Sequence, residues 1–407
     1  MDIKKLLVVI GFIVLVALVG FALYWVFFKQ PNEERILQNY NGGTIPSGNE
    51  GNLNVVNDDN ANNDQTLPWQ EYLEDKVSPV AAGGLTQVTR ITDSEVSGVI
   101  SGIDGIQYYD EEAQQFYRIN EKGEAELMSN NKFFQVENVN WAKSGNKAIL
   151  EYPDGSNILY NFSNGKQVTL PPELEDFGFN TIGNQITAKW IGNNDDNNWL
   201  IAANDDGSGM FLLEPLGDQA HNTQMGFSPD NQVAALHRKY IDAQRQQVFP
   251  IGLHGENLKA FTVNGSGFVS EWSPEGNSMI YSVYHEDTDY MPSMYVTKGS
   301  TSELGDIKIS LNVATWPEKC TFSGESTLYC AVPQGLPRGA GMYPEIAQEY
   351  PDNFYHIDLE SGTKTLIASP IGDSASYSAN GLSVSDDGSF LYFIDQNTGL
   401  LQSIRLK

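Results

Sequence analysis

From Leu85 onward the chain alternates short apolar runs with polar turns. In EWSPEGNSMIYSVY, residues 271–284, an aromatic residue ends one run, Ser-Pro-Glu-Gly follows, and a second alternating run begins. Pro has the φ that the second position of a β-turn requires, and Gly accepts a positive φ without steric cost. The pattern therefore predicts a strand, a tight turn and a second strand. A single hairpin is only marginally stable in water, so the fold depends on how often this unit recurs.

The same unit recurs at intervals of 41, 49, 37, 45, 50 and 62 residues, measured between the apolar residues that precede the turns. These seven anchors are Ile100, Trp141, Trp190, Phe227, Trp272, Phe322 and Val384. A period of about 45 residues is typical of a four-stranded propeller blade. The sequence predicts an all-β fold, a seven-bladed β-propeller over residues 85–407, with six or eight blades as alternatives. We expect the aromatic anchors to pack between blades rather than to bind a ligand.

The two ends of the repeat region predict how the ring closes. After Val384 the chain has room for three strands, roughly residues 382–385, 389–395 and 400–406. The segment LTQVTRIT, residues 85–92, has β-rich composition and alternation and lies before the first anchor. We expect it to supply the missing outer strand of the last blade, because this pairing would remove an exposed sheet edge.

The turn sequence resembles the WD40-like propeller repeat of the TolB type, which is also seen in dipeptidyl-peptidase-like propellers. FSPDN from Phe227 and WSPEG from Trp272 match it best, while VSDDG from Val384 and WAKSG from Trp141 are degraded copies. The unit at Trp190 lacks the turn sequence. The resemblance implies a propeller outside the cytoplasm that binds proteins or envelope components. The chain has no room for the N-terminal domain of TolB proteins or for a peptidase domain, so those functions do not carry over.

An uncharged segment of 23 residues, Leu6 to Phe28, precedes the repeats. At the helical rise it spans about 35 Å, enough to cross a hydrocarbon core of about 30 Å. Aromatic residues at its end suit a membrane interface better than a signal-peptide cleavage site. Lys4 and Lys5 before the helix favour a cytoplasmic N-terminus. We expect a single-pass membrane protein whose propeller lies outside the cytoplasm.

The chain divides into three predicted parts: an anchor at residues 1–30, a linker at 31–84 and the propeller at 85–407. Residues 39–65 are rich in Asn, Gly and Asp and carry few large apolar side chains. Such a segment buries too little apolar surface to offset its ordering entropy. It is predicted to be a flexible tether.

Two cysteines, Cys320 and Cys330, flank a hairpin loop centred on Glu325. That register places them directly opposite each other on antiparallel strands, within reach of a disulfide. Two unpaired core thiols are the alternative. A disulfide would agree with an oxidising compartment.

The net charge of the chain and the motifs that it lacks limit the activities we expect of it. Asp and Glu total 52 against 24 Lys and Arg, a net charge of -28. Such a surface repels phosphate backbones, so we expect no nucleic-acid binding. The sequence shows no nucleophile elbow, Walker A or zinc motif, and we predict no catalytic residue, metal or cofactor. HEDTD, residues 285–289, is the densest group of potential metal ligands, but it reads as a polar hairpin loop.

The sixth unit holds a long insertion, PQGLPRGAGMYPEIAQEYPD, residues 333–352, where other units use a short turn. Long connections in compact repeats are uncommon and often functional. Arg338, Met342, Tyr343 and Tyr350 are therefore the predicted partner-binding residues. The alternative is that the loop folds back over its own blade.

The function these observations predict is a membrane-tethered propeller that serves as a protein interaction platform in the cell envelope. Its expected partners are the membrane, through the N-terminal helix, and envelope or surface proteins. An envelope polysaccharide-binding module is the first alternative. An enzyme with carboxylates converging in the channel is the second.

Overall fold

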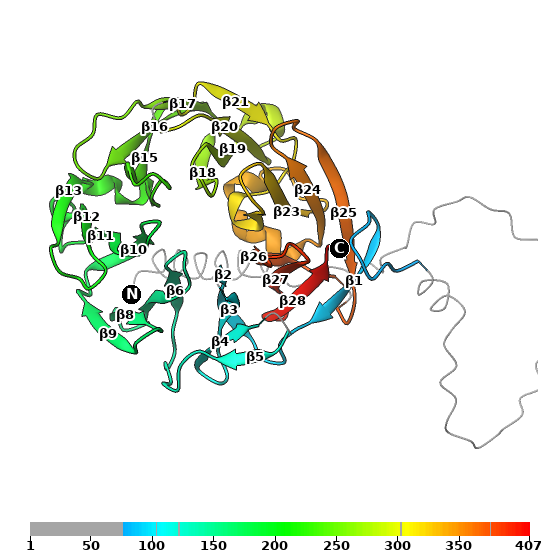
Figure 1. Cartoon of the computed structure of the whole chain (residues 1–407). Helices are drawn as coiled ribbons and strands as arrows, with labels where there is room; N and C mark the ends of the chain where they lie inside the picture. Colours follow the sequence, from blue (N-terminus) through cyan, green and yellow to red (C-terminus); the bar gives the residue numbers. More distant parts are fainter. Residues whose placement is uncertain (1–75, 103, 121–122, 302, 375) are drawn as a thin grey trace, which may run out of the picture. The chain divides into compact units, whose positions relative to one another are not determined.

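Short β-strands arranged around a ring make up the part of the chain that the structure describes (Figure 1). The structure is a computed structural model, and it describes residues 76–407 except residues 103, 121–122, 302 and 375. The predicted membrane helix at 6–28 and the predicted linker up to residue 75 lie outside this range. Within it, no helix is long and apolar enough to cross a membrane.

Five sheets of the ring are separate and have four antiparallel strands each. The first two consist of β2 (Val96–Gly102), β3 (Gly105–Asp110), β4 (Gln115–Ile119) and β5 (Ala125–Leu127), then β6 (Asn138–Trp141), β7 (Lys147–Glu151), β8 (Asn157–Asn161) and β9 (Lys166–Leu170). The third and fourth consist of β10 (Leu174–Phe179), β11 (Gln185–Trp190), β12 (Trp199–Asn204) and β13 (Phe211–Pro215), then β14 (Thr223–Met225), β15 (Val233–Asp242), β16 (Arg245–Gly252) and β17 (Phe261–Asn264). The fifth consists of β18 (Ser266–Trp272), β19 (Ser278–Tyr284), β20 (Pro292–Lys298) and β21 (Ile307–Ser310).

The remaining strands form one eight-stranded sheet in the order β22-β23-β24-β25-β1-β28-β27-β26. Its strands are β22 (Cys320–Phe322), β23 (Thr327–Pro333), β24 (Asp352–Asp358), β25 (Lys364–Ile371), β1 (Leu85–Arg90), β28 (Leu400–Arg405), β27 (Phe390–Asp395) and β26 (Ala379–Val384). Every neighbouring pair is antiparallel except β1 and β25, which run parallel. The parallel junction divides the sheet into a β22–β25 half and a β26–β1 half.

The described residues also contain six short 3-10 helices between strands. These are η1 (Asp195–Asn197), η2 (Gly217–Asn222), η3 (Glu286–Thr288), η4 (Pro317–Lys319), η5 (Ala340–Met342) and η6 (Pro344–Glu349).

Strand β1 closes the ring, as the sequence predicted. Val88 pairs with Ile404 of β28, so the N-terminal strand adds a fourth strand to the last three strands of the chain, β26, β27 and β28. The first half of β1 also pairs with β25, where Leu85 lies opposite Ser369. This second pairing was not predicted. Because β1 is bonded on both sides, seven separate blades are not found: five sheets are separate, and the strands expected to form the last two blades are joined.

The third repeat unit begins elsewhere than the sequence analysis placed it. Trp190 lies at the end of β11, the second strand of its sheet. The residue equivalent to the other anchors is Phe179, which ends the inner strand β10 and is followed by the turn Asn-Thr-Ile-Gly-Asn. Gly183 in that turn has φ +68°, the left-handed conformation that glycine adopts without strain.

Apolar side chains fill the spaces between neighbouring sheets. Between the first two sheets, Phe116 packs edge-on against Phe133, Trp141 and Phe162, with ring centroids 5.0–5.5 Å apart. Phe116 is fully buried. Edge-to-face aromatic pairs of this kind add about 0.5–1.5 kcal/mol beyond their burial. The packing fixes the positions of the inner strands that face the centre of the ring.

Two polar connections stabilise the eight-stranded sheet. The predicted disulfide is present: Cys320 lies opposite Cys330 in the ladder, and the two Sγ atoms are 2.12 Å apart. A buried ion pair joins Lys319 of η4 to Asp352 of β24, with 2.9 Å between Nζ and Oδ2. Lys319 Nζ also donates to the backbone carbonyl of Ala379 at 2.6 Å, so this ammonium ties the two halves together.

Candidate functional site

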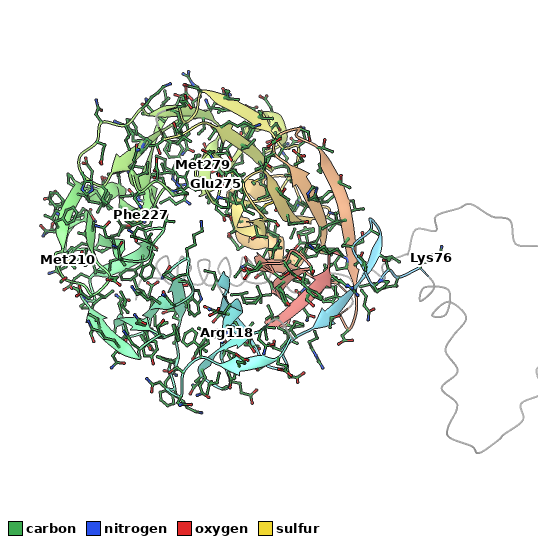
Figure 2. The ribbon with its side chains drawn as sticks, in the orientation of Figure 1. Lys76, Arg118, Met210, Phe227, Glu275 and Met279 are labelled. Carbon is green, nitrogen blue, oxygen red and sulfur yellow. A yellow bond between two sulfur atoms is a disulfide. The ribbon has the colours of Figure 1, made fainter. Side chains whose placement is uncertain are left out.

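The centre of the ring contains a cavity of about 580 Å³. The innermost strands of all five separate sheets line it, together with the innermost strands β22 and β26 of the eight-stranded sheet. Figure 2 shows Phe227 on the inner side of the ring, whereas Met210 lies at its outer edge. A volume of this size is within the range of small-ligand pockets.

The repeat anchors form much of the cavity wall. The aromatic lining residues at the ends of the inner strands are Trp141, Phe179, Phe227, Trp272 and Phe322. Each also packs against an apolar cluster of its own region of the ring, as we expected for the anchors. These aromatic residues therefore do two things at once: they pack against the apolar core of a blade, as the sequence analysis predicted for the anchors, and they also line the cavity.

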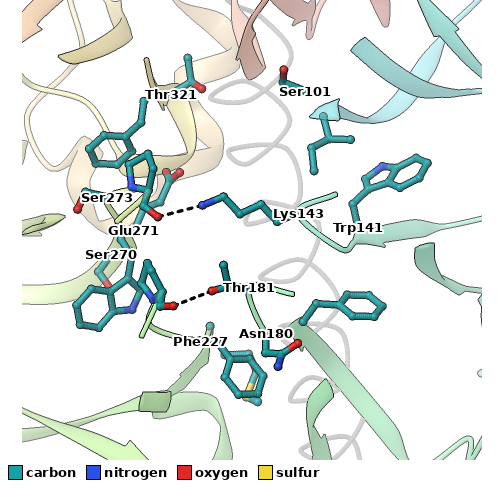
Figure 3. A pocket seen from close by; sticks show the side chains of 18 of the residues that line it. Ser101, Trp141, Lys143, Asn180, Thr181, Phe227, Ser270, Glu271, Ser273 and Thr321 are labelled. Carbon is teal, nitrogen blue, oxygen red and sulfur yellow. Dashed lines mark hydrogen bonds between the residues drawn. The ribbon is translucent and has the colours of Figure 1, made fainter. Parts of the chain in front are cut away.

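Polar contacts beside the cavity join turns of different sheets. Lys143, in the turn after β6, extends toward the wall that carries Glu271 and Ser273 (Figure 3), and its Nζ donates to the backbone carbonyl of Pro274 at 3.1 Å. Thr181 Oγ1 donates to the carbonyl of Pro229 at 3.1 Å. The turns of the repeat are therefore connected to one another around the cavity.

Glu325 makes the most extensive of these turn contacts. Its carboxylate accepts hydrogen bonds from the Ser273 hydroxyl at 2.5 Å and from the backbone N–H groups of Glu275 and Asn277 at 2.8 and 3.1 Å. A carboxylate with several backbone donors is strongly held. The Ser-Pro-Glu-Gly turn of the fifth sheet is thereby fixed to the β22–β25 half.

Glu271 is the acidic residue among those that line the cavity, and Lys143 is the basic one. Burial among the channel walls raises the pKa of Glu271, and the nearby carboxylate of Glu318 raises it further. The Glu271 side chain is nevertheless exposed to the cavity, so water there reaches its carboxylate and limits this rise. Within the described part of the chain, Glu271 has no ion-pair partner.

The predicted partner-binding loop lies at the opposite ends of the strands. It leaves β23 at the end away from the cavity turns and forms η5 and η6, which appear in yellow and orange inside the ring in Figure 1. Its first half packs on the fifth sheet: the N–H of Gly339 donates to the carbonyl of Asp289 at 2.9 Å, and that of Gly341 to Tyr290 at 2.8 Å. Its second half contacts its own sheet, where the hydroxyl of Ser378 donates to the carbonyl of Ala347 at 3.3 Å. A Cβ on Gly341 would lie 2.5 Å from the Cβ of Tyr284, so this close approach requires glycine.

The four predicted residues of this loop have different surroundings. Met342 and Tyr343 are exposed, at 43% and 60% of their surface. Arg338 forms an exposed ion pair with Asp289 at 3.3 Å. Tyr350 is half-buried. The loop thus covers part of the neighbouring sheet, and its exposed apolar contribution is limited to Met342 and Tyr343.

Sequence analysis missed a second exposed apolar pair beside this loop. Tyr240 and Ile241, at the tip of the β15–β16 hairpin, are 52% and 47% exposed. Burial raises the pKa of Tyr284, and the neighbouring hydroxyls of Tyr240 and Tyr343 raise it further, so the three tyrosines lie close together. We call Tyr240, Ile241, Tyr284, Met342 and Tyr343 the tyrosine surface. Its sequence signal is the unusual length of β15, ten residues in which an apolar pair stands just before the final Asp242.

No group of three or more His, Cys, Asp or Glu side chains in the described residues is arranged to hold a metal ion. In HEDTD, His285 Nδ1 lies 3.8 Å from Asp287 Oδ2. The neighbouring Asp289 faces Arg338 instead. These side chains serve a turn that contacts the insertion.

Comparison with known proteins bears on the fold alone. No family model matches the chain, and no curated protein matches it. A β-propeller domain from Myceliophteria thermophila is similar at 10% identity and a TM-score of 0.52, covering 79% of this chain and all of that domain. An oligogalacturonate lyase from Vibrio parahaemolyticus (11% identity, TM-score 0.49) covers 79% of this chain and 93% of its own, and the propeller domain of the Trilobed protease from Pyrococcus furiosus (10%, 0.42) covers 74% and 78%. Together with the sheet topology, the first likeness identifies the described chain as a β-propeller.

Proposed function

We propose that this protein is a membrane-tethered β-propeller of the TolB-like type that works outside the cytoplasm as a protein interaction platform in the cell envelope. In this proposal the two halves of the eight-stranded sheet act as two blades, which gives seven in all. The uncharged segment Leu6 to Phe28 supports the membrane tether. The disulfide between Cys320 and Cys330 agrees with an oxidising compartment.

The tyrosine surface is the observation that carries the proposed interaction. Four of its side chains, Tyr240, Ile241, Met342 and Tyr343, are between 43% and 60% exposed. Tyrosine and methionine are enriched at protein interfaces, and gathered exposed apolar groups mark interaction sites more often than single ones do. The insertion is fixed to the fifth sheet by backbone hydrogen bonds, so a partner would bind it with little loss of loop entropy.

The charge around this surface favours a partner with an acidic rim. On the same hairpin as Tyr240, the exposed Lys239 and the half-buried Arg238 add positive charge, while Arg245 is paired with Asp242; the chain as a whole carries a net charge of -28. Interfaces commonly place such charges at the rim, where they select partners and speed association. The preferred partner therefore carries apolar side chains surrounded by carboxylates.

Serine variants test this proposal. Met342→Ser with Tyr343→Ser, and separately Tyr240→Ser, should keep the melting temperature within about 1 °C, because exposed positions contribute little to stability. Both should lose the same protein that the wild-type chain captures from native membranes. Ile307→Ser, at a 55% exposed position on the outer strand β21, is the matched control and should retain it. Retention of that protein by the tyrosine-surface variants would contradict the proposal.

Envelope polysaccharide binding remains a second candidate, because Tyr240 and Tyr343 are exposed aromatic rings that each lie near Tyr284. A glycan array separates the two functions. Binding of a glycan that depends on both tyrosines, without any protein captured, would favour the polysaccharide.

A further inference from the structure

The central cavity carries an inference that is independent of the tyrosine surface. We propose that this cavity binds a primary ammonium group on an alkyl chain, in the place that the ammonium of Lys143 takes in this structure. Three features carry it: the way Lys143 is held, the carboxyl group of Glu271 on the cavity wall, and the aromatic residues around them.

Lys143 crosses the cavity but is weakly held there. Its Nζ forms no ion pair with a carboxylate of the described residues and donates to one uncharged carbonyl, that of Pro274, 131 positions along the chain. The side chain is exposed. A solvent-accessible hydrogen bond from an ammonium to an uncharged carbonyl is readily exchanged for one to water. The position is therefore suited to an ammonium group, and a competing ammonium can displace Lys143 from it.

One carboxylate on the cavity wall, that of Glu271, has no ion-pair partner among the described residues. Glu318 of η4 lies near enough for its negative charge to raise the pKa of Glu271, whereas the positive charge of Lys319 acts on Glu318 in the opposite direction. The ammonium of Lys319 is ion-paired with Asp352 and donates a hydrogen bond to the carbonyl of Ala379. An ammonium bound beside Glu271 would favour the ionised form of this carboxyl group and offset the negative charge of Glu318.

The wall around these charges suits an alkyl-ammonium more than a hydrated metal ion. Trp141, Trp272 and Phe227 contribute aromatic surface to the cavity. Aromatic rings attract ammonium groups through their faces and pack against methylene chains. Metal ions of the hard type require several oxygen ligands in a fixed arrangement, and no such group is present among the described residues. The net charge of -28 also concentrates cations near the protein.

Such a group has two sources: a free diamine, or a lysine side chain of a protein partner. Calorimetric titration of the purified full-length chain with cadaverine and with a peptide containing one lysine compares them. 1-Pentanol, which lacks the ammonium, should not bind. If both cadaverine and the peptide bind, the cavity recognises an ammonium group on an alkyl chain and needs no other part of a partner protein. Binding of the peptide alone assigns the site to a partner's lysine, and binding of neither overturns the proposal.

Two variants locate the site. Glu271→Gln should weaken binding by about tenfold or more, the usual effect of losing a charge-assisted hydrogen bond. Lys143→Met should strengthen binding, because it removes the competing ammonium. Glu360→Gln makes the same change of charge at an exposed turn of the β22–β25 half and should leave affinity within about twofold, since exposed charges at a distance are screened.

The opposite results would overturn the proposal. If Lys143→Met weakened cadaverine binding, the lysine would be part of the site rather than a competitor for it. If Glu271→Gln and Glu360→Gln weakened binding equally, the attraction would belong to the surface as a whole. Melting curves of each variant show that the ring remains folded in the compared samples.

Discussion

Removal of strand β1 should open the propeller. We compare a chain lacking residues 1–92 with one lacking residues 1–64, which keeps β1 and the segment before it. The segment from residue 78 to 92 contacts both halves of the eight-stranded sheet, whereas residues 1–64 lie outside the described range. The first deletion should destabilise the ring sharply, and the second should not.

The size of the effect follows from what the segment contributes. Outside the strand ladder, four backbone hydrogen bonds join it to the ring: Ala81 to Arg405, Gly83 to Ile367, Ile91 to Leu401, and Ser369 to Gly84. At about 1 kcal/mol each they supply about 4 kcal/mol. Val88, only 6% exposed, adds about 2 kcal/mol of apolar burial. The sum of about 6 kcal/mol is comparable with the total stability of many domains.

Thermal unfolding and size-exclusion chromatography measure the outcome. The chain lacking residues 1–92 should melt at a much lower temperature and self-associate, because the edge of β28 is left unpaired. Val88→Ala in the intact chain should lower the melting temperature by about 3–6 °C, whereas Gln87→Ala, at an exposed position of the same strand, should not. Equal melting temperatures for the two truncated chains would refute the closure account.

Three further predictions concern other parts of the chain. Deletion of residues 1–30 should yield a soluble, folded protein, and aggregation of that product would contradict the separation of anchor and ring. Reduction of the Cys320–Cys330 disulfide, which closes a loop of sequence separation 10, should cost about 3 kcal/mol in denaturant unfolding, and unchanged unfolding would show that the bond does not stabilise the ring. Burial raises the pKa of Asp352 from 3.8 to about 6, so the folded chain holds a proton that the unfolded chain has released. The contribution of this group to the free energy of unfolding is full below about pH 4 and is lost as the pH rises through 6. Asp352→Asn should therefore flatten the dependence of the melting temperature on pH between about pH 4 and 6. An unchanged slope would assign that dependence to other groups.

The elements that the sequence predicted correctly depend on local signals. Cys320 and Cys330 were placed opposite each other because a tight turn sets the register of the strands on either side. The closing strand was predicted from a shortage of strands after Val384 and a β-rich segment at the other end. Trp190 was mistaken for an anchor because the Asn- and Asp-rich run that follows it has turn composition, while the true turn after Phe179 lacks the Ser-Pro pattern.

The candidate sites depend on contacts that no local pattern specifies. The cavity is formed by inner strands from every sheet, so Lys143 and Glu271 meet there although they are far apart in the chain. The insertion was found by its length, but its packing on the fifth sheet depends on Gly341 meeting Tyr284 across many residues. Side-chain exposure at Tyr240 likewise depends on which neighbours cover it. Alternation along a strand predicts on which face of the sheet a side chain lies, but it does not predict which other residues pack beside that side chain.

A photo-reactive amino acid at position 343 tests the interaction platform most directly. Tyr343 is 60% exposed at the centre of the proposed contact, and Ile307, 55% exposed on the outer rim, provides the matched position. Irradiation of native membranes that contain each full-length variant shows which proteins lie against the two positions. The account predicts one discrete protein adduct from position 343 that is absent from position 307. No adduct at position 343, or the same adducts at both positions, would contradict it.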